Sequence, residues 1–167
     1  QKTLFYRKWA DRYGELAKDT SKISHLPDIA AKIRIIPAND FFIFLESPEV
    51  NLPVLIEGNR ENRQAFEYLM AWGLLTKNVE AVVENVKMMK EMGYESIPRH
   101  IEEAILIYYN SKRVFPDLGG LKMKPATMIR FDQYFAAYLE ARKDPATMEQ
   151  KMREKFSDTF WYYFHFK

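Results

Sequence analysis

Apolar residues recur every three or four positions along most of the chain, and strict alternation of apolar and polar residues is almost absent. A spacing of three and four places apolar side chains on one side of an α-helix, whereas a period of two is typical of a half-buried strand. The pattern therefore predicts an all-α protein with at least six helices and no sheet of three or more strands.

The first third of the chain is predicted to contain three helices and a loop-rich insert. A helix is predicted over residues 2–18, and its apolar positions are Leu4, Phe5, Trp9 and Tyr13. Prolines, which are favoured in the first turn of a helix, open two short helices over residues 27–34 and 47–57. Residues 35–47 are predicted to form a loop-rich insert that includes a packed loop at 41–45, because a proline disfavours helix in the residue before it.

The clearest unit is a pair of helices over residues 60–76 and 79–92. Each has one apolar face, made of Phe66, Leu69, Met70 and Gly73 on the first and Val79, Val82, Val83, Val86 and Met89 on the second. The link between them is only Lys77-Asn78, so the two helices must run antiparallel as neighbours, with Asn78 as the N-cap of the second. Gly93 is suited to ending that helix.

Three further helices are predicted over residues 98–111, over 125–143 and from 145 onward. The first is apolar nearly all round, which is typical of a central, buried helix. Residues 160–166 are an unusually aromatic ending. They are interpreted as a final helical turn or a tail packed on the preceding helices, and an anchor at a partner or membrane surface is the alternative.

Composition narrows the classes of function. With 47% hydrophobic and 15% aromatic residues among 167, the chain can bury a core, which argues against disorder. The net charge is +2 and the two signs alternate along the chain, so no basic stripe and no nucleic-acid partner are expected. The absence of cysteine excludes disulfides and thiolate metal sites, and no apolar run approaches the roughly 20 residues of a membrane span.

Candidate chemistry is sparse. His100 lies three residues before Glu103 and beside Glu102, but a metal site in a helical bundle needs further inward-facing carboxylates, and no second such unit is present. These three side chains are therefore expected to form a first helical turn that faces solvent. No nucleophile elbow, P-loop or dinucleotide-binding motif occurs. We accordingly predict no catalytic residue, no cofactor and no metal.

Asp132 is predicted to lie on the inner side of its helix, between Met128 and Phe135. A buried carboxylate there is expected to pair with a cation, and the alternative is a functional acid with a shifted pKa. The candidate partners of the carboxylate are Arg12, Arg63 and Arg130.

Residues 65–94 resemble one tetratricopeptide repeat (TPR), a pair of antiparallel helices with a period of about 34 residues. Phe66 and Leu69 match large packing positions of the repeat, but Met70 stands where a small residue is usual, so the match is degenerate. The resemblance implies antiparallel hairpins stacked as a TPR-like right-handed array.

A wider resemblance connects the chain to a bacterial family of unknown function. The segments that carry it are Lys2–Trp9, Asn62–Met70, Leu74–Lys77, Pro98–Ala104 and Asp158–Tyr163. Members of this family resemble large membrane proteins with a multi-spanning N-terminal half and a soluble TPR-like C-terminal half. Since the chain begins with Gln1, not Met, it is expected to be the last portion of such a protein, folded as a single domain over residues 1–167. The resemblance implies architecture and gives no activity and no side of the membrane.

Two functions are consistent with this architecture. The leading hypothesis is a non-catalytic scaffold for a protein or peptide partner, because TPR-like arrays present concave surfaces to partner segments. The residues expected to line that surface are Arg63, Glu67, Lys77, Asn78 and Asn85. The alternative is an accessory or capping domain of a membrane-embedded enzyme or transporter in the N-terminal half.

The first helix is expected to leave apolar surface uncovered, because it carries more apolar and aromatic side chains than one face can hold. Such a surface tends to find a partner. We therefore expect the chain to self-associate through this helix, or to cover it with residues 35–45.

Overall fold

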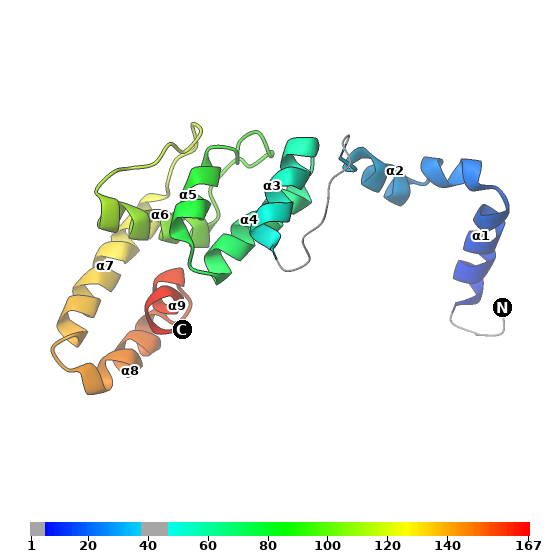
Figure 1. Cartoon of the computed structure of the whole chain (residues 1–167). Coiled ribbons are helices and arrows are strands. Elements are labelled where there is room, and N and C mark those ends of the chain that lie inside the picture. Colours follow the sequence, from blue (N-terminus) through cyan, green and yellow to red (C-terminus); the bar gives the residue numbers. More distant parts are fainter. Residues whose placement is uncertain (1–5, 38–46) are drawn as a thin grey trace.

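The computed structural model of the chain describes residues 6–37 and 47–167 (Figure 1). Within these two ranges it contains α-helices α1 to α9, one short 3-10 helix and no strand, so the predicted all-α class is confirmed. In the described part of the chain, every helix is too short or too polar to cross a bilayer.

The helices begin and end close to the predicted positions. In chain order they are α1 (Arg7–Lys18), η1 (Thr20–His25), α2 (Pro27–Arg34), α3 (Pro48–Gly58), α4 (Arg63–Leu75), α5 (Val79–Val86), α6 (Arg99–Lys112), α7 (Pro125–Ala141), α8 (Pro145–Phe156) and α9 (Phe160–Phe166). The packed loop that the sequence predicts at 41–45 lies outside the described residues.

The helices α1, η1 and α2 form an arm that extends away from the rest of the molecule (Figure 1). Within the arm, α1 and α2 both pack on η1. The arm meets the body at the end of α3, where the side-chain amide of Asn59 donates hydrogen bonds to the carbonyl oxygens of Arg34 and Ile36. The arm is therefore fixed to the body at its α2 end, and α1 lies at its far end.

The body consists of α3 to α9, and its first unit is the α4–α5 hairpin that the sequence predicts. The faces of the two helices meet in one core with Phe66 and Val86 fully buried. Gly73 allows this approach, because a Cβ at that position would lie 2.7 Å from Cγ2 of Val82. Asn78 caps α5 as predicted, since its side-chain oxygen accepts a hydrogen bond of 3.1 Å from the Ala81 N–H.

The second helix of the hairpin is shorter than its apolar period indicates. It ends at Val86 and not near residue 92, and the chain continues in turns as far as Gly93. The N–H groups of Met88 and Met89 bond to carbonyl oxygens three residues earlier, which is the tighter pattern of a helix end. Met89 and Met92 nevertheless remain buried. The apolar spacing therefore predicted which residues are buried, but not where the helix ends.

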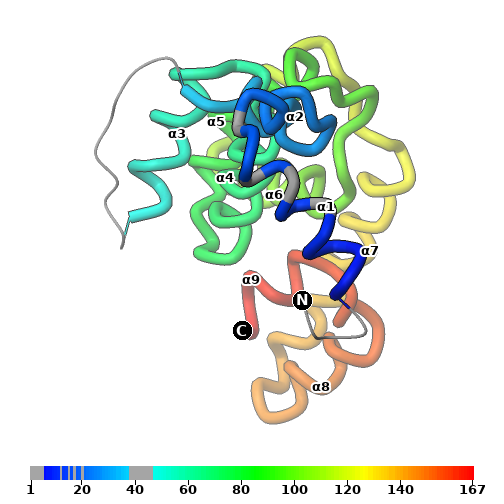
Figure 2. The backbone as a smooth tube through the Cα atoms, turned by 90° about the vertical axis from the view of Figure 1, so that its right-hand side faces the viewer, coloured from blue at the N-terminus to red at the C-terminus, as the bar shows by residue number. Residues whose placement is uncertain are grey.

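Helix α6 is the centre of the body, as its apolar sequence predicts. It contacts α4, α5, α7 and α9. In Figures 1 and 2 alike, α8 and α9 lie below α4 and α5, and α9 returns to pack beside α6. The aromatic ending is thus a helix inside the fold, with Trp161 fully buried, which confirms the packing interpretation.

A second, smaller core surrounds Trp161 between α7, α8 and α9. Tyr134 packs against the indole and against the ring of Phe156. The Tyr134 hydroxyl lies 3.1 Å from the Trp161 carbonyl oxygen and 2.8 Å from Nδ1 of His165. Burial raises the pKa of Tyr134 and lowers the pKa of His165, so both side chains stay neutral at neutral pH.

Asp132 corrects one expectation. It lies on the exposed side of α7, and the carboxylate that pairs with Arg130 is instead Asp158, at 2.7 Å. Arg63 pairs with Glu67, four residues further along α4, at 2.9 Å. The period of α7 places Asp132 outward because Tyr134, two residues later, is the side chain that enters the core.

Two adjacent glycines in the loop before α7 should respond very differently to alanine. Gly119 has a φ of +58°, and a Cβ there would collide with the Lys87 carbonyl oxygen. Gly120 has a φ of +81°, but its nearest neighbour would be the flexible Lys90 Nζ, 3.7 Å away. We expect Gly119→Ala to lower the free energy of unfolding by about 2–3 kcal/mol and Gly120→Ala by only about 1 kcal/mol. Urea titrations of both variants test this, and equal losses would contradict the close approach at Gly119.

Candidate functional site

Helix α4 is apolar on two sides. One side faces the core, and the other carries Tyr68, Trp72 and Leu75, which are 60%, 37% and 63% exposed, together with the exposed Ala71. These four positions have the spacing of a single helix face, and we call them the α4 stripe. A contiguous apolar face in contact with water is characteristic of a binding surface.

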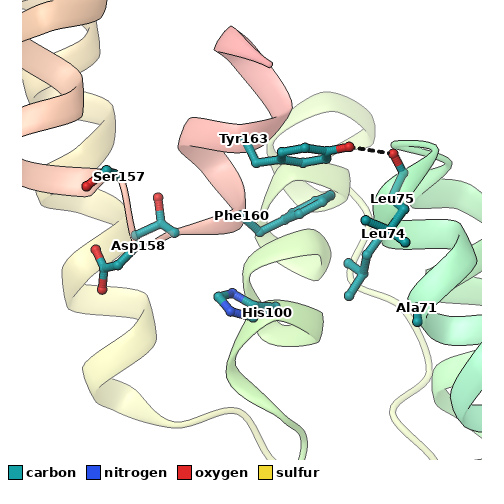
Figure 3. Close-up of a pocket in the computed structure, with 9 residues that line it drawn as sticks. Ala71, Leu74, Leu75, His100, Ser157, Asp158, Phe160 and Tyr163 are labelled. Carbon is teal, nitrogen blue, oxygen red and sulfur yellow. Dashed lines mark hydrogen bonds between the residues drawn. The ribbon is translucent and has the colours of Figure 1, made fainter.

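A groove of about 540 Å³ runs along one edge of the α4 stripe. Its lining residues are Ala71, Leu74, Leu75, His100, Ser157, Asp158, Thr159, Phe160 and Tyr163. Figure 3 shows the rings of Phe160 and Tyr163 extending from α9 toward Leu74 and Leu75 of α4, with His100 of α6 beneath them. Its size and mainly apolar lining are typical of a site that takes an organic group or a side chain of a partner.

A smaller hollow of about 320 Å³ lies on the other edge of the α4 stripe. Trp72 lines this hollow, whereas Ala71 and Leu75 line the groove, and the carboxylate at the hollow is Glu49 of α3. The stripe is therefore a ridge with a hollow on each side.

The wall of the groove that α9 provides is fastened to α4. The Tyr163 hydroxyl donates a 2.7 Å hydrogen bond to the carbonyl oxygen of Leu75, and the Lys77 ammonium lies 5.4 Å from the centroid of the Tyr163 ring. Carbonyl groups in the last turn of a helix have no partner within the helix, so this bond satisfies one of them. The groove is consequently formed before any partner binds.

The floor of the groove is held by a fully buried carboxylate, Glu103. Its Oε2 accepts a 2.6 Å hydrogen bond from the Phe160 N–H and lies 2.9 Å from Nδ1 of His100. Its Oε1 accepts no hydrogen bond from the described residues, but the Arg99 Nε lies 3.2 Å away and supplies an opposite charge. The indole N–H of Trp161 donates to the backbone carbonyl of Glu103 at 2.8 Å.

The neighbouring carboxylate, Glu102, accepts hydrogen bonds from the start of another helix, α7. It is also fully buried, and it accepts a 2.7 Å hydrogen bond from the Lys124 N–H and another from the Thr127 hydroxyl at the start of α7. Helix N-termini present unpaired N–H groups and a partial positive charge, which a carboxylate stabilises. Adjacent carboxylates of α6 thus anchor the first turns of two different helices.

These contacts overturn the expectation that the first turn of α6 faces solvent. Of the three side chains in that expectation only His100 is exposed, whereas both glutamates are buried against α7 and α9, which lie later in the chain. The segment between α8 and α9 is anchored as well. Asp158 pairs with Arg99 at 3.1 Å and with Arg130 at 2.7 Å, which joins α6 and α7 to one edge of the groove.

The residues predicted to form a partner surface do not come together. Arg63 and Glu67 pair at the start of α4, where the Tyr94 hydroxyl donates a 3.2 Å hydrogen bond to Glu67, and burial together with that carboxylate raises the pKa of Tyr94. Lys77 and Asn78 form the turn beyond the other end of α4.

The fifth predicted residue, Asn85, is half-buried and donates a 2.8 Å hydrogen bond to the Ala81 carbonyl. The set is therefore divided by the length of α4, which is roughly 20 Å for 13 residues. The α4 stripe between the two ends was missed, although its signal is present in the sequence as apolar residues on both sides of one helix.

Among the described residues, no group of three or more His, Asp or Glu side chains is placed to hold a metal ion. Comparison with known families gives one match, which covers residues 1–167. The chain belongs to the DUF6057 family, a family of unknown function. No curated protein and no solved structure matches this DUF6057 chain. Its groove and α4 stripe are thus described from its own geometry alone.

Proposed function

We propose that this domain is a non-catalytic scaffold that binds a helical segment of a protein on the α4 stripe and in the groove beside it. One observation carries the proposal: Tyr68, Trp72 and Leu75 form an exposed apolar ridge next to a groove whose walls are already in place. An amphipathic helix laid on such a surface recognises it through side chains spaced three and four residues apart.

The fixed walls favour binding. Tyr163 is hydrogen-bonded to α4, and Phe160 is held by Glu103, so a partner would not have to order these side chains. A site that is formed in advance loses less conformational entropy on binding and therefore binds more tightly.

The proposal extends to the architecture of the whole protein. We propose that α4 and α5 are a degenerate TPR-like repeat within an array of stacked hairpins, and that the parent is a bacterial membrane protein. Support for this comes from the packing positions of the hairpin and from the segments that resemble that family. The bound helix then belongs to a protein that the membrane protein assembles with.

Site-specific cross-linking in the full-length protein tests the function. A photoreactive amino acid at Leu75 should give a covalent adduct with a defined protein partner, because this side chain is 63% exposed on the stripe. The same group at Leu139 on α7, which is 46% exposed, serves as the matched control and should give no such adduct. Mass spectrometry of the adducts identifies the partner.

A second substitution makes the test specific. Tyr68→Glu places a charge on the stripe two helical turns away from the cross-linker and should reduce the Leu75 adduct at least about tenfold, since interface centres carry most of the binding energy. Equal adducts at Leu75 and Leu139, or an adduct insensitive to Tyr68→Glu, would contradict the proposed function.

A further inference from the structure

Helix α1 carries an aromatic stripe of its own. Tyr6 and Trp9 are 67% and 60% exposed, and the Tyr13 ring lies beside the indole of Trp9, with 4.8 Å between ring centroids. The spacing of three and four residues places all three side chains on one face of the helix. Like α4, α1 thus presents a large apolar surface to water.

The two surfaces match in shape. Positions 68, 71, 72 and 75 of α4 have the spacing of the four residues that form a hole for one side chain of a facing helix, and the smallest of the four is Ala71. Trp9 is the side chain of suitable size on α1. In both stripes the first and last side chains are seven positions apart, or about 10.5 Å along a helix axis.

The charges beside the two stripes are also complementary. The carboxylate that lines the hollow beside Trp72 is Glu49, whereas Asp158 at the groove already pairs with Arg99 and Arg130. On α1, the residues next to Tyr6 and Trp9 are the exposed Arg7 and Lys8. Docking of α1 on α4 would therefore bring exposed basic side chains of α1 toward the carboxylate of Glu49.

The arm holds α1 away from the α4 of the same chain. Asn59 fastens the α2 end of the arm to the end of α3, and α1 lies at the opposite end, far from the groove (Figure 1). A second copy of the chain has no such restraint. We propose that two copies form a dimer in which α1 of each docks on the α4 stripe of the other, a proposal that rests on the function proposed above for that stripe.

The area supports a dimer. Aromatic side chains bury about 150–250 Å² each, so the exposed anchors of two reciprocal α1–α4 contacts would remove roughly 1,200 Å² from water. Stable protein interfaces start at about 1,200 Å². One such contact alone would fall short, and the reciprocal pair with two-fold symmetry reaches this size.

Sedimentation velocity of residues 1–167 over a range of concentrations is the first test. We expect a reversible dimer with a dissociation constant on the order of 1–10 μM. Trp9→Glu and Leu75→Glu should each weaken it at least about tenfold, whereas the control Leu139→Glu on α7 should leave it unchanged. Circular dichroism verifies that each variant keeps its helices. A chain that is monomeric throughout, or a dimer that neither stripe variant weakens, overturns the proposal.

Because the chain contains no cysteine, single-cysteine variants can locate the contact. A tagged Lys8→Cys chain mixed with an untagged Thr76→Cys chain should form a mixed disulfide, and Lys8→Cys mixed with Leu139→Cys should not. A disulfide that closes within one chain carrying both Lys8→Cys and Thr76→Cys, without dimer, would overturn the assignment to a second copy.

The two proposals fail in different ways. A monomeric chain whose Leu75 cross-links to another protein leaves the scaffold function intact and refutes the dimer. A chain that neither dimerises through these stripes nor cross-links from Leu75 refutes both.

Discussion

Replacing Glu103 by alanine should lower the free energy of unfolding by about 3–5 kcal/mol, because it removes one partner of a buried charged network. The Phe160 N–H would lose its acceptor inside the protein, where water cannot replace it. Arg99 would lose one of its two carboxylate partners and keep the other, Asp158. The loss should also loosen α9 and with it the wall of the groove. Urea unfolding followed by tryptophan fluorescence measures the change, since Trp161 is packed next to this site.

Two further variants separate the contributions. Glu103→Gln keeps an oxygen for the Phe160 N–H and removes only the charge, so its loss should be smaller than that of Glu103→Ala. Glu84→Ala removes an exposed glutamate on α5 and should change the stability by less than about 0.5 kcal/mol. A loss below about 1 kcal/mol for Glu103→Ala would show that the buried carboxylate is not holding α9.

Val86→Asp should destabilise the body by about 4 kcal/mol. Val86 is fully buried between α4 and the rest of the core, so aspartate would either bury a charge or take up a proton in an apolar site. Lys87→Asp adds the same side chain at the exposed next position and is the matched control, expected to stay within about 0.5 kcal/mol. Equal unfolding midpoints for the two variants would mean that the hairpin faces are assigned incorrectly.

The parts of the fold that depend on local pattern could be predicted. The core faces of α4 and α5 follow from apolar spacing, and their antiparallel arrangement follows from a link too short for any other. The end of α5 could not be predicted in the same way. Met89 and Met92 are buried and keep the three-residue apolar spacing of a helix, but the backbone there forms turns. The spacing of apolar residues indicates burial, and burial does not require a helix.

The buried carboxylates show a different limit. Acidic residues in the first turn of a helix are stabilised by its dipole while facing water, so Glu102 and Glu103 fit a solvent-exposed turn equally well. What buries them lies elsewhere in the chain, with the Phe160 N–H 57 positions after Glu103. No local pattern reports such a contact.

For the candidate site, the apolar residues of α4 are a signal in the sequence, but apolar residues are normally assigned to the core. Tyr68, Trp72 and Leu75 are apolar residues of a helix whose other side already supplies the core. A helix that is apolar on all sides is either buried on all sides or exposes one apolar side to a binding partner. Only the arrangement of the neighbouring helices distinguishes these two cases. Two residues of the predicted polar surface, Asn78 and Asn85, use their side chains on the backbone of their own helix, which their positions at and inside a helix explain.

The paired carboxylates of α6 have a consequence for the order in which the body forms. On a ribosome, α6 is synthesised before α7, and long before α9. Until the later helices exist, Glu103 has only Arg99 and His100 of its own turn beside it, and the donors that meet Glu102 are absent. Burying the two carboxylates at that stage would leave oxygens without hydrogen-bond donors. The first turn of α6 can therefore enter the core only when both α7 and α9 have arrived. Assembly of this part of the body must await the synthesis of α9 and then proceed as one cooperative step.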